Sequence, residues 1–364
     1  MKILYFSLVS WTWIKQRPQF ICEMLTAQGF TLDFLYLKPI FKGKLTSLTS
    51  ERLNVIGKRV LPFAMKMNFI ERINRYYISL CLKHRQYDII ILTHPRQLEF
   101  IPLKLRNSLP IIYDCMDNLP FFYKGKYLET TKHQERLLCT EAQAVITSSD
   151  YIKQRLTYDY EITSSKITVI KNAVDSNFKN MPLTPLKLKS PNLAYIGTLS
   201  EWLDLQLLCR FASRHPEITI YLIGPQEKFS HPSLPSNLVI YGTVEHQLVK
   251  SCIANADVML LPFITNELIR GVNPVKMYEY IAMNKFIVSA WWNELNEFHS
   301  NPMVAFYRDP DEFEQLVMRS LELSKSVPVP VINEFFIKSN CWENRIAEYE
   351  KVLCRAKEAE GANR

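Results

Sequence analysis

The sequence predicts an α/β protein built from two Rossmann-like domains, each with a mainly parallel β-sheet. The chain has 364 residues, more than one typical domain holds. Short runs rich in valine, isoleucine and leucine alternate with helical patterns along its whole length, as expected for parallel strands covered on both faces. The alternation stops once, in the proline-bearing stretch 179–191, and then restarts. We therefore expect domains at 1–180 and 190–340, with a C-terminal helix in 341–364 that packs back towards the first domain.

The first half contains buried-strand patterns separated by helical ones. The expected strands are 2–8, 31–37, 87–93, 109–115, 142–149 and 166–172, with helices at 16–28, 68–85 and 151–158. The second half repeats the arrangement. Its expected strands are 192–197, 218–225, 238–244, 257–263 and 285–290, with helices at 203–214 and 245–254 and another that Asn273-Pro274 begins. In open parallel sheets ligands bind at the carboxyl ends of the strands, so the binding site is expected in the cleft between the domains.

Composition and missing motifs exclude several classes of protein. With 48% hydrophobic and 22% charged residues the chain is an ordinary globular protein. Its eight cysteines are scattered, which favours reduced thiols over disulfides or a metal site. No GxGxxG, GxxxxGK[ST] or HExxH pattern occurs, and no apolar run reaches the ~18–20 residues of a membrane span. The DPD at 309–311 is better interpreted as a helix start capped by Asp309 than as a metal ligand set, so no metal site is predicted.

The net charge of +8 is concentrated in the first half. Residues 38–106 contain 14 lysines and arginines against 4 acidic residues, interleaved with apolar side chains. Three interpretations are open: a solvated basic face, contact with an anionic membrane surface, or nucleic-acid binding. No nucleic-acid recognition motif accompanies the charge, so nucleic acid is not expected as a partner.

Several segments in the right order resemble GT-B glycosyltransferases of family 4. They are 167–178 (ITVIKNAVDSNF), 192–225, 238–263 and 266–289. Residues 11–20 and 111–122 are similar to a subgroup that assembles bacterial surface polysaccharides, including teichuronic-acid transferases and, more distantly, the glucuronosyltransferase of xanthan assembly. The resemblance implies the GT-B fold, in which two Rossmann-like domains face each other across a cleft.

Lys276 and Glu279 are the strongest candidates for donor binding. A positive side chain in the first helical turn opposes the helix dipole, but it suits a helix tip that meets an anion. The resemblance implies that Lys276 acts as a catalytic residue at the developing pyrophosphate and that Glu279 accepts hydrogen bonds from the ribose. It further implies donor-binding roles for Arg270, Gly197, Thr198, Gly224 and Asn273. The alternative is a surface Lys–Glu pair. Gly271 stands where the family has a second glutamate, so that contact to the transferred sugar is missing.

Asp117 is the candidate catalytic base, because the resembling segment of the xanthan-type relative has a base at this position. The alternative is that Asp117 caps the following turn. On the acceptor side we expect Asp114, Arg17, Trp13 and His94. The plainer alternatives are that Trp13 belongs to the core, that Arg17 is solvated and that His94 is structural.

We therefore expect a metal-independent hexosyl or uronosyl transferase without a cofactor. Its co-substrate would be a nucleotide diphosphate sugar, and a uridine-linked one is expected. Its acceptor would be a bacterial surface polysaccharide or lipid-linked glycan, reached by a cytoplasmic protein attached peripherally to the inner face of the membrane. The alternatives are a sugar-nucleotide epimerase of the same fold and a non-catalytic sugar-nucleotide-binding scaffold.

Overall fold

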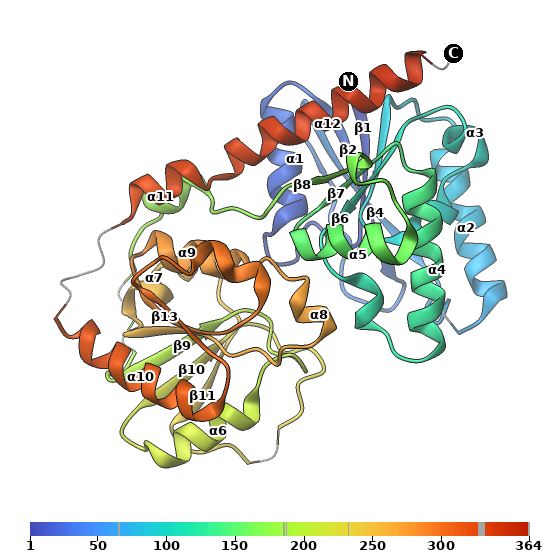
Figure 1. Ribbon diagram of the computed structural model, residues 1–364. Coiled ribbons are helices and arrows are strands. Elements are labelled where there is room, and N and C mark those ends of the chain that lie inside the picture. The colour runs from blue at the N-terminus through green and yellow to red at the C-terminus, as the bar shows by residue number, and fades with distance from the viewer. Residues whose placement is uncertain (65, 185, 187, 232, 327–331, 363–364) are drawn as a thin grey trace. The chain divides into compact units, whose positions relative to one another are not determined.

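The chain forms two compact units (Figure 1). The computed structural model describes residues 1–64, 66–184, 186, 188–231, 233–326 and 332–362. Unit 1 comprises Met1–Lys171 and the chain from Trp342 onward, and unit 2 comprises Asn172–Cys341. The chain thus enters unit 2 before the proline-bearing stretch. Hydrogen bonds explain this boundary, because Lys250 Nζ donates to the carbonyls of Lys179 and Met181, which ties the stretch to unit 2.

Unit 1 is built on one sheet whose strand order is β3-β4-β2-β1-β5-β6-β7-β8. All neighbouring strands are parallel except β3, which is antiparallel to β4. The strands are β1 Lys2–Ser7, β2 Thr31–Pro39, β3 Leu48–Thr49, β4 Leu53–Val60, β5 Ile89–Leu92, β6 Ile111–Cys115, β7 Ala144–Thr147 and β8 Ile167–Val169. The predicted strands are all present. The sequence pattern does not predict β3, which has only two residues, or β4, whose apolar pattern is interrupted by polar and charged residues.

Helices cover both faces of this sheet. They are α1 Arg17–Ala27, α2 Asn68–Leu82, α3 Leu103–Arg106, α4 Lys126–Glu141, α5 Asp150–Tyr160 and α12 Trp342–Ala362. One face packs against Ile78 of α2, Leu138 of α4 and Ile152 of α5. On the other face α12 packs against α1 and β6, and the ring of Trp342 stacks on Phe20. The C-terminal helix is therefore an integral part of unit 1.

Unit 2 contains a parallel sheet with the order β11-β10-β9-β12-β13-β14. Its strands are β9 Asn192–Ile196, β10 Thr219–Ile223, β11 Leu238–Gly242, β12 Val258–Leu261, β13 Phe286–Ala290 and β14 Val304–Tyr307. Its helices are α6 Leu205–Arg214, α7 His246–Asn255, α8 Glu267–Arg270, α9 Val275–Ala282, α10 Pro310–Ser324 and α11 Glu334–Ser339. Asp309 caps α10 as predicted, accepting from the amides of Asp311 and Glu312.

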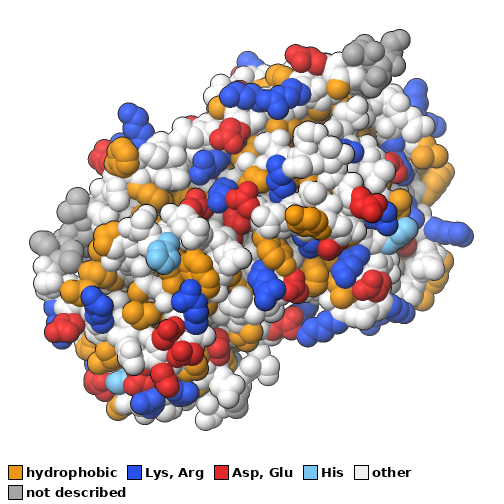
Figure 2. All heavy atoms as spheres, viewed as in Figure 1, with side chains coloured by type: hydrophobic (Ala, Val, Ile, Leu, Met, Phe, Trp, Pro, Cys, Tyr) orange, Lys and Arg blue, Asp and Glu red, His pale blue; other side chains and the backbone are white. Residues whose placement is uncertain are grey.

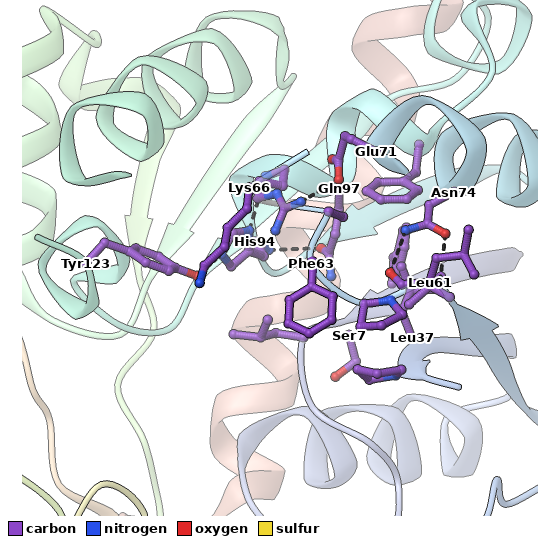
Figure 3. A pocket seen from close by; sticks show the side chains of 18 residues that line it. Ser7, Leu37, Leu61, Phe63, Lys66, Glu71, Asn74, His94, Gln97 and Tyr123 are labelled. Carbon is purple, nitrogen blue, oxygen red and sulfur yellow. Dashed lines mark hydrogen bonds and ion pairs between the residues drawn. The ribbon is translucent and has the colours of Figure 1, made fainter. Parts of the chain in front are cut away.

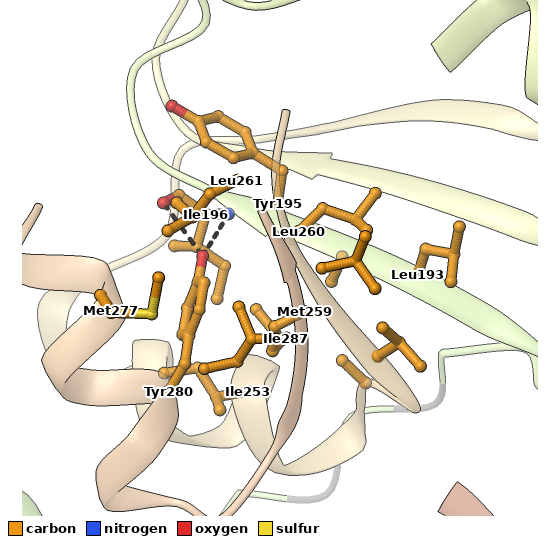
Figure 4. Close-up of a cluster of buried hydrophobic side chains, with 14 of the residues drawn as sticks. Leu193, Tyr195, Ile196, Ile253, Met259, Leu260, Leu261, Met277, Tyr280 and Ile287 are labelled. Atoms are coloured by element: carbon orange, nitrogen blue, oxygen red, sulfur yellow. Dashed lines mark hydrogen bonds between the residues drawn. The ribbon is translucent and has the colours of Figure 1, made fainter. Parts of the chain in front are cut away.

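The core of unit 2 fixes α9 against the centre of the sheet. Met277 and Tyr280 of α9 are fully buried with Met259 of β12 and Ile287 of β13 (Figure 4). The Tyr280 hydroxyl accepts a hydrogen bond of 3.1 Å from the backbone amide of Ile196 in β9. Helix α9 is thereby anchored to the sheet through its buried side.

The eight cysteines are free thiols, in agreement with the sequence interpretation. Among the helices in the described ranges, none has the length and apolar character needed to cross a bilayer.

Candidate active site

The beginning of α9 lies at the carboxyl edge of the unit 2 sheet. Because α9 connects the parallel strands β12 and β13, it runs opposite to them and starts where they end. The strand order reverses direction between β9 and β12, and such a reversal opens a crevice at the carboxyl ends of the two strands. The first turn of α9 is therefore in the position where doubly wound sheets bind ligands.

Lys276 and Glu279 form an ion pair on this first turn. Their Nζ and Oε2 atoms are 2.7 Å apart, and the side chains are 21% and 5% exposed. A surface pair at this spacing would leave both side chains in water. Here the carboxylate is buried, and the lysine is the more accessible member. A cation that reaches solvent at a helix N-terminus can meet an anion, and the buried carboxylate can accept hydrogen bonds from hydroxyl groups of the same ligand.

Asn273 does not cap α9, contrary to the sequence prediction. The helix begins at Val275, with Pro274 at the cap position and no side-chain hydrogen bond to the helix. The Oδ1 atom of Asn273 instead accepts from the Asn172 amide at 2.9 Å, and the Asn172 side chain donates to the Asn273 carbonyl at 2.6 Å. The Asn273 side chain is thus engaged with the start of unit 2, which leaves the helix tip without a side-chain cap.

Gly197 and Gly224 follow the adjacent strands β9 and β10 at the same edge. Gly224 has φ +146°, and a Cβ there would lie 2.0 Å from the Gly197 carbonyl oxygen. Only glycine fits this close approach of two backbones. The Thr198 carbonyl accepts from the Tyr195 hydroxyl at 3.1 Å. These residues shape the loop beside the crevice. Backbone packing is sufficient to explain why position 224 is a glycine.

Arg270 lies at the end of the short helix α8. It is largely exposed and pairs with Glu267 at 2.9 Å. Gly271, which follows it, is the C-cap of that helix. Arg270 is therefore a solvent-accessible cation close in sequence to the start of α9. Its ion-pair partner is exposed, whereas the partner of Lys276 is buried.

In unit 1, Asp114 and Arg17 form a buried ion pair. Arg17 Nη2 lies 3.0 Å from Asp114 Oδ1, and its Nη1 donates to the Ile170 carbonyl at 2.7 Å. The alternative that Arg17 is solvated is wrong, because the residue is almost fully buried in the first turn of α1. Both side chains point into unit 1, and this geometry favours a structural role for the pair over contact with an acceptor.

Two tyrosines complete the surroundings of Asp114, and sequence reasoning missed both. The hydroxyls of Tyr5 in β1 and Tyr349 in α12 donate to Asp114 Oδ2 at 3.1 and 3.2 Å. Burial, with a further contribution from Asp114, raises the pKa of each hydroxyl well above its ordinary value, so both keep their protons. Nothing local in the sequence connects Tyr349 with a residue 235 positions away.

Asp117 lies just beyond the carboxyl end of β6. Asp117 is not the cap residue of the next helical turn, because the cap position is Asn118, and no side-chain hydrogen bond caps that turn. The residue is half-buried. Burial raises its pKa to about 6, Asp114 adds to the rise, and Arg17 opposes it. A carboxylate with this pKa can take a proton near neutral pH.

His94 follows β5 at the carboxyl edge of the same sheet (Figure 3). Its Nδ1 accepts from the Arg96 amide at 3.1 Å, so the neutral ring carries its proton on Nε2, which lies 3.3 Å from the Tyr123 hydroxyl. Burial, assisted by Arg96, lowers its pKa to about 3. His94 is therefore neutral at physiological pH and caps the turn that follows it.

Trp13 is 39% exposed, so the alternative that placed it in the core is wrong. Within the described residues, no group of three or more histidine, cysteine, aspartate or glutamate side chains has the spacing of a metal site.

We predict that Asp114→Asn destabilises unit 1 by about 3–5 kcal/mol, because it leaves Arg17 charged and buried without its counterion. Urea unfolding followed by fluorescence measures the change. The control is Glu141→Gln, which removes a surface partner of Arg106 and should cost less than about 1 kcal/mol. An Asp114→Asn protein of parental stability would show that the carboxylate acts on a ligand instead.

The comparisons with known proteins agree with this geometry. Residues 21–178 match the model of Glycosyltransferase Family 4, and residues 203–327 match a glycosyl transferase-like model. The chain is 22% identical over 311 residues to the putative teichuronic acid biosynthesis glycosyltransferase TuaH of Bacillus subtilis, covering 76% of each protein.

Solved structures share the whole fold at low sequence identity. Sucrose-phosphate synthase from Thermosynechococcus elongatus superposes with a TM-score of 0.77 at 12% identity, covering 98% of this chain and 99% of that one. Anabaena Alr3699/HepE in complex with UDP and glucose gives 0.69 at 13%, covering 97% and 99%. Glycosyltransferase models match both halves of the chain, the first of them a family 4 model, and the chain shares the fold of solved GT-B structures, so this protein is a glycosyltransferase of the GT-B kind.

Proposed function

We propose that the protein transfers a hexosyl or uronosyl group from a uridine diphosphate sugar to a bacterial surface polysaccharide or a lipid-linked glycan. The observation that carries the proposal is the Lys276–Glu279 pair on the uncapped first turn of α9, at the switch point of the unit 2 sheet. The HepE structure that shares this fold holds UDP and glucose, and TuaH is described as a teichuronic acid biosynthesis enzyme, which favours this donor and this class of acceptor.

In the proposed donor site, one side chain binds the diphosphate of the nucleotide and another binds its ribose. The diphosphate meets the backbone amides at the start of α9, and Lys276 moves from Glu279 to the phosphate oxygens. Glu279, which is then free of its internal partner, accepts hydrogen bonds from the ribose hydroxyls. As the bond from the anomeric carbon to the diphosphate breaks, negative charge grows on the leaving group, and Lys276 stabilises it where it develops.

Asp117 is the proposed base. It removes the proton of the acceptor hydroxyl while that oxygen forms its bond to the anomeric carbon, and UDP leaves with the electron pair. Because Lys276 and the helix N-terminus supply the positive charge that a metal ion would bring to the diphosphate, we propose transfer without a metal or other cofactor.

An exposed apolar stripe on α2 supports contact with a membrane. Phe69, Ile73, Tyr76, Tyr77 and Leu80 recur at helical spacing, and all are exposed. Monomeric proteins rarely leave such a contiguous row in water. Basic residues lie around it, and Figure 2 shows hydrophobic and basic side chains together over the part of unit 1 where α2 lies. Anionic lipids attract such a surface, and the apolar row can enter the headgroup region.

The apolar and basic surface of α2 also supports a proposal for where the protein is located in the cell. Nucleotide sugars are cytoplasmic substrates, and the acceptor class is membrane-bound. A cytoplasmic protein held peripherally at the inner face of the membrane reaches both.

Lys276→Ala should lower kcat/KM by about 10²–10³-fold, the usual cost of removing one group that stabilises transition-state charge. Product formation from UDP sugars measures it. Lys276→Arg should restore part of the activity because it keeps the charge, and Lys325→Ala, at an exposed lysine that ends α10, is the control. UDP at ~100 times its Kd should stabilise the parent by about 2.7 kcal/mol in thermal unfolding. Parental turnover in Lys276→Ala would contradict the phosphate role.

The transfer rate should rise with pH through an inflection at about 6, the pKa of Asp117, because only the carboxylate can accept a proton. Asp117→Asn should lose transfer but keep UDP binding. It should also be at least as stable as the parent at pH 7. The raised pKa means that the stability contributed by Asp117 is lost as the pH rises from about 4 through 6. Full activity of Asp117→Asn would place the base elsewhere.

The double variant Ile73→Ser/Tyr76→Ser should bind vesicles of phosphatidylglycerol and phosphatidylcholine roughly tenfold more weakly, since burying these side chains is worth more than ~1.4 kcal/mol. Cosedimentation measures the binding, which should also weaken with added salt. The control is Tyr158→Ser, an aromatic residue on α5 that is more exposed than Ile73 and Tyr76. If the double variant and the control sediment alike, α2 is not the membrane contact.

A further inference from the structure

Three hydroxyl side chains without any exposed surface lie at the end of β7 in unit 1. They are Thr147, Ser148 and Ser149. Strand β7 lies next to β6 in the sheet (Figure 1), and the last pair of their parallel ladder is Cys115 with Thr147. Ser148 is therefore the first residue beyond the ladder, opposite the loop that leads from β6 to Asp117.

Ser148 makes two hydrogen bonds to this loop. Its backbone amide donates to the Cys115 carbonyl at 3.2 Å. Its side-chain hydroxyl donates to the Met116 carbonyl at 2.6 Å, across 32 positions of the sequence. The peptide unit between Met116 and Asp117 is thus fixed by a side chain from the neighbouring strand, at the point where the regular pairing of the two strands has ended.

Two further donors fix the other side of Asp117. The Leu119 amide donates to the Asp117 carbonyl at 2.8 Å, and the Cys115 thiol donates to the same oxygen at 3.5 Å. Burial, with a further contribution from Glu135, raises the pKa of this thiol well above its ordinary value, so Cys115 keeps the proton that it donates. Both peptide units that flank Asp117 therefore have fixed directions, and these set the direction in which its side chain leaves the backbone.

We propose that Ser148 is a positioning residue for the transfer reaction, whose hydroxyl holds the backbone at Asp117 so that the carboxylate stays out of bulk water and keeps its orientation towards the acceptor hydroxyl. This proposal rests on the proposed function, because it takes Asp117 to be the base. Ser148 itself is fully buried and touches no substrate. It acts through the Met116 carbonyl alone.

The titration of Asp117 reports on this positioning. Burial is the largest cause of the rise of its pKa to about 6, Arg17 in α1 opposes the rise and Asp114 in β6 adds to it. Tyr5 of β1 and Tyr349 of α12 donate to Asp114 and keep their protons. If the loop moves towards water, the effect of burial shrinks and the pKa of Asp117 falls towards the ordinary value of about 4.

The experiment needs no acceptor, because the stability of the full chain reports the pKa of Asp117. Urea unfolding is measured from pH 4 to 7 for the parent and Asp117→Asn, and for the same pair in the Ser148→Ala background. Since the raised pKa disfavours the carboxylate in the folded state, the unfolding constant of the parent relative to Asp117→Asn should rise roughly fiftyfold between pH 4 and 7. With Ser148→Ala we expect this rise to be less than about tenfold.

Two further variants separate positioning from a general loss of stability. Thr147→Val removes a hydroxyl that is equally buried but donates to the Ser149 carbonyl, at the cap of α5, at 3.1 Å. It should lower the stability equally with and without Asp117→Asn at every pH, as independent sites do. Ser148→Thr keeps the hydroxyl and should keep the parental pH dependence, whatever stability its added methyl group costs.

Two results would overturn the positioning role. The first is the same pH dependence in the Ser148→Ala background as in the parent, since a purely structural hydroxyl lowers the stability of both members of each pair alike. The second is an identical pH dependence of the parent and Asp117→Asn, because the carboxylate would then not be held out of water. Failure of the proposed function would show differently, as product formation from UDP sugars that persists in Asp117→Asn while the unfolding data follow the expectation.

Discussion

The buried contact between Asp114 and Arg17 is the interaction on which unit 1 depends. Four elements meet there, because Arg17 begins α1, Asp114 belongs to β6, and the two tyrosines come from β1 and α12. Arg17 also holds the Ile170 carbonyl, directly before the chain enters unit 2. A buried ion pair is costly unless its donors and acceptors find partners, so these elements must assemble together. The same charges act on Asp117, the proposed base: burial raises its pKa, Arg17 opposes the rise and Asp114 adds to it.

The ion pair of unit 2 differs from that of unit 1 in its exposure to solvent. The Lys276–Glu279 pair has one buried member and one accessible member, on a helix whose tip lacks a side-chain cap. Such a pair can exchange internal partners for a ligand at little cost in stability, whereas the Asp114–Arg17 pair cannot open without unfolding its surroundings. This difference in burial is the reason that we propose a binding role for the Lys276–Glu279 pair and a structural role for the Asp114–Arg17 pair.

The surface of unit 1 adds a third use of charge. Along α2, the exposed basic residue Arg72 lies among exposed apolar side chains. That combination suits contact with an anionic membrane, in which negatively charged headgroups cover an apolar interior. The proposed membrane contact therefore belongs to the unit whose sequence is basic.

The sequence by itself determined the α/β class, the two series of parallel strands and the position of Lys276 and Glu279, because hydrophobic period and helix-start patterns are local. It also located Asp117 behind a buried strand. Only the tertiary structure determined which groups these side chains contact. Asn273 was expected to cap α9, but an amide 101 positions away takes its side chain. The sequence left two interpretations of Arg17, a solvated residue or one that contacts the acceptor, and the fold instead buries it against Asp114. Burial and long-range pairing depend on which segments meet in space, and a linear pattern does not contain that information.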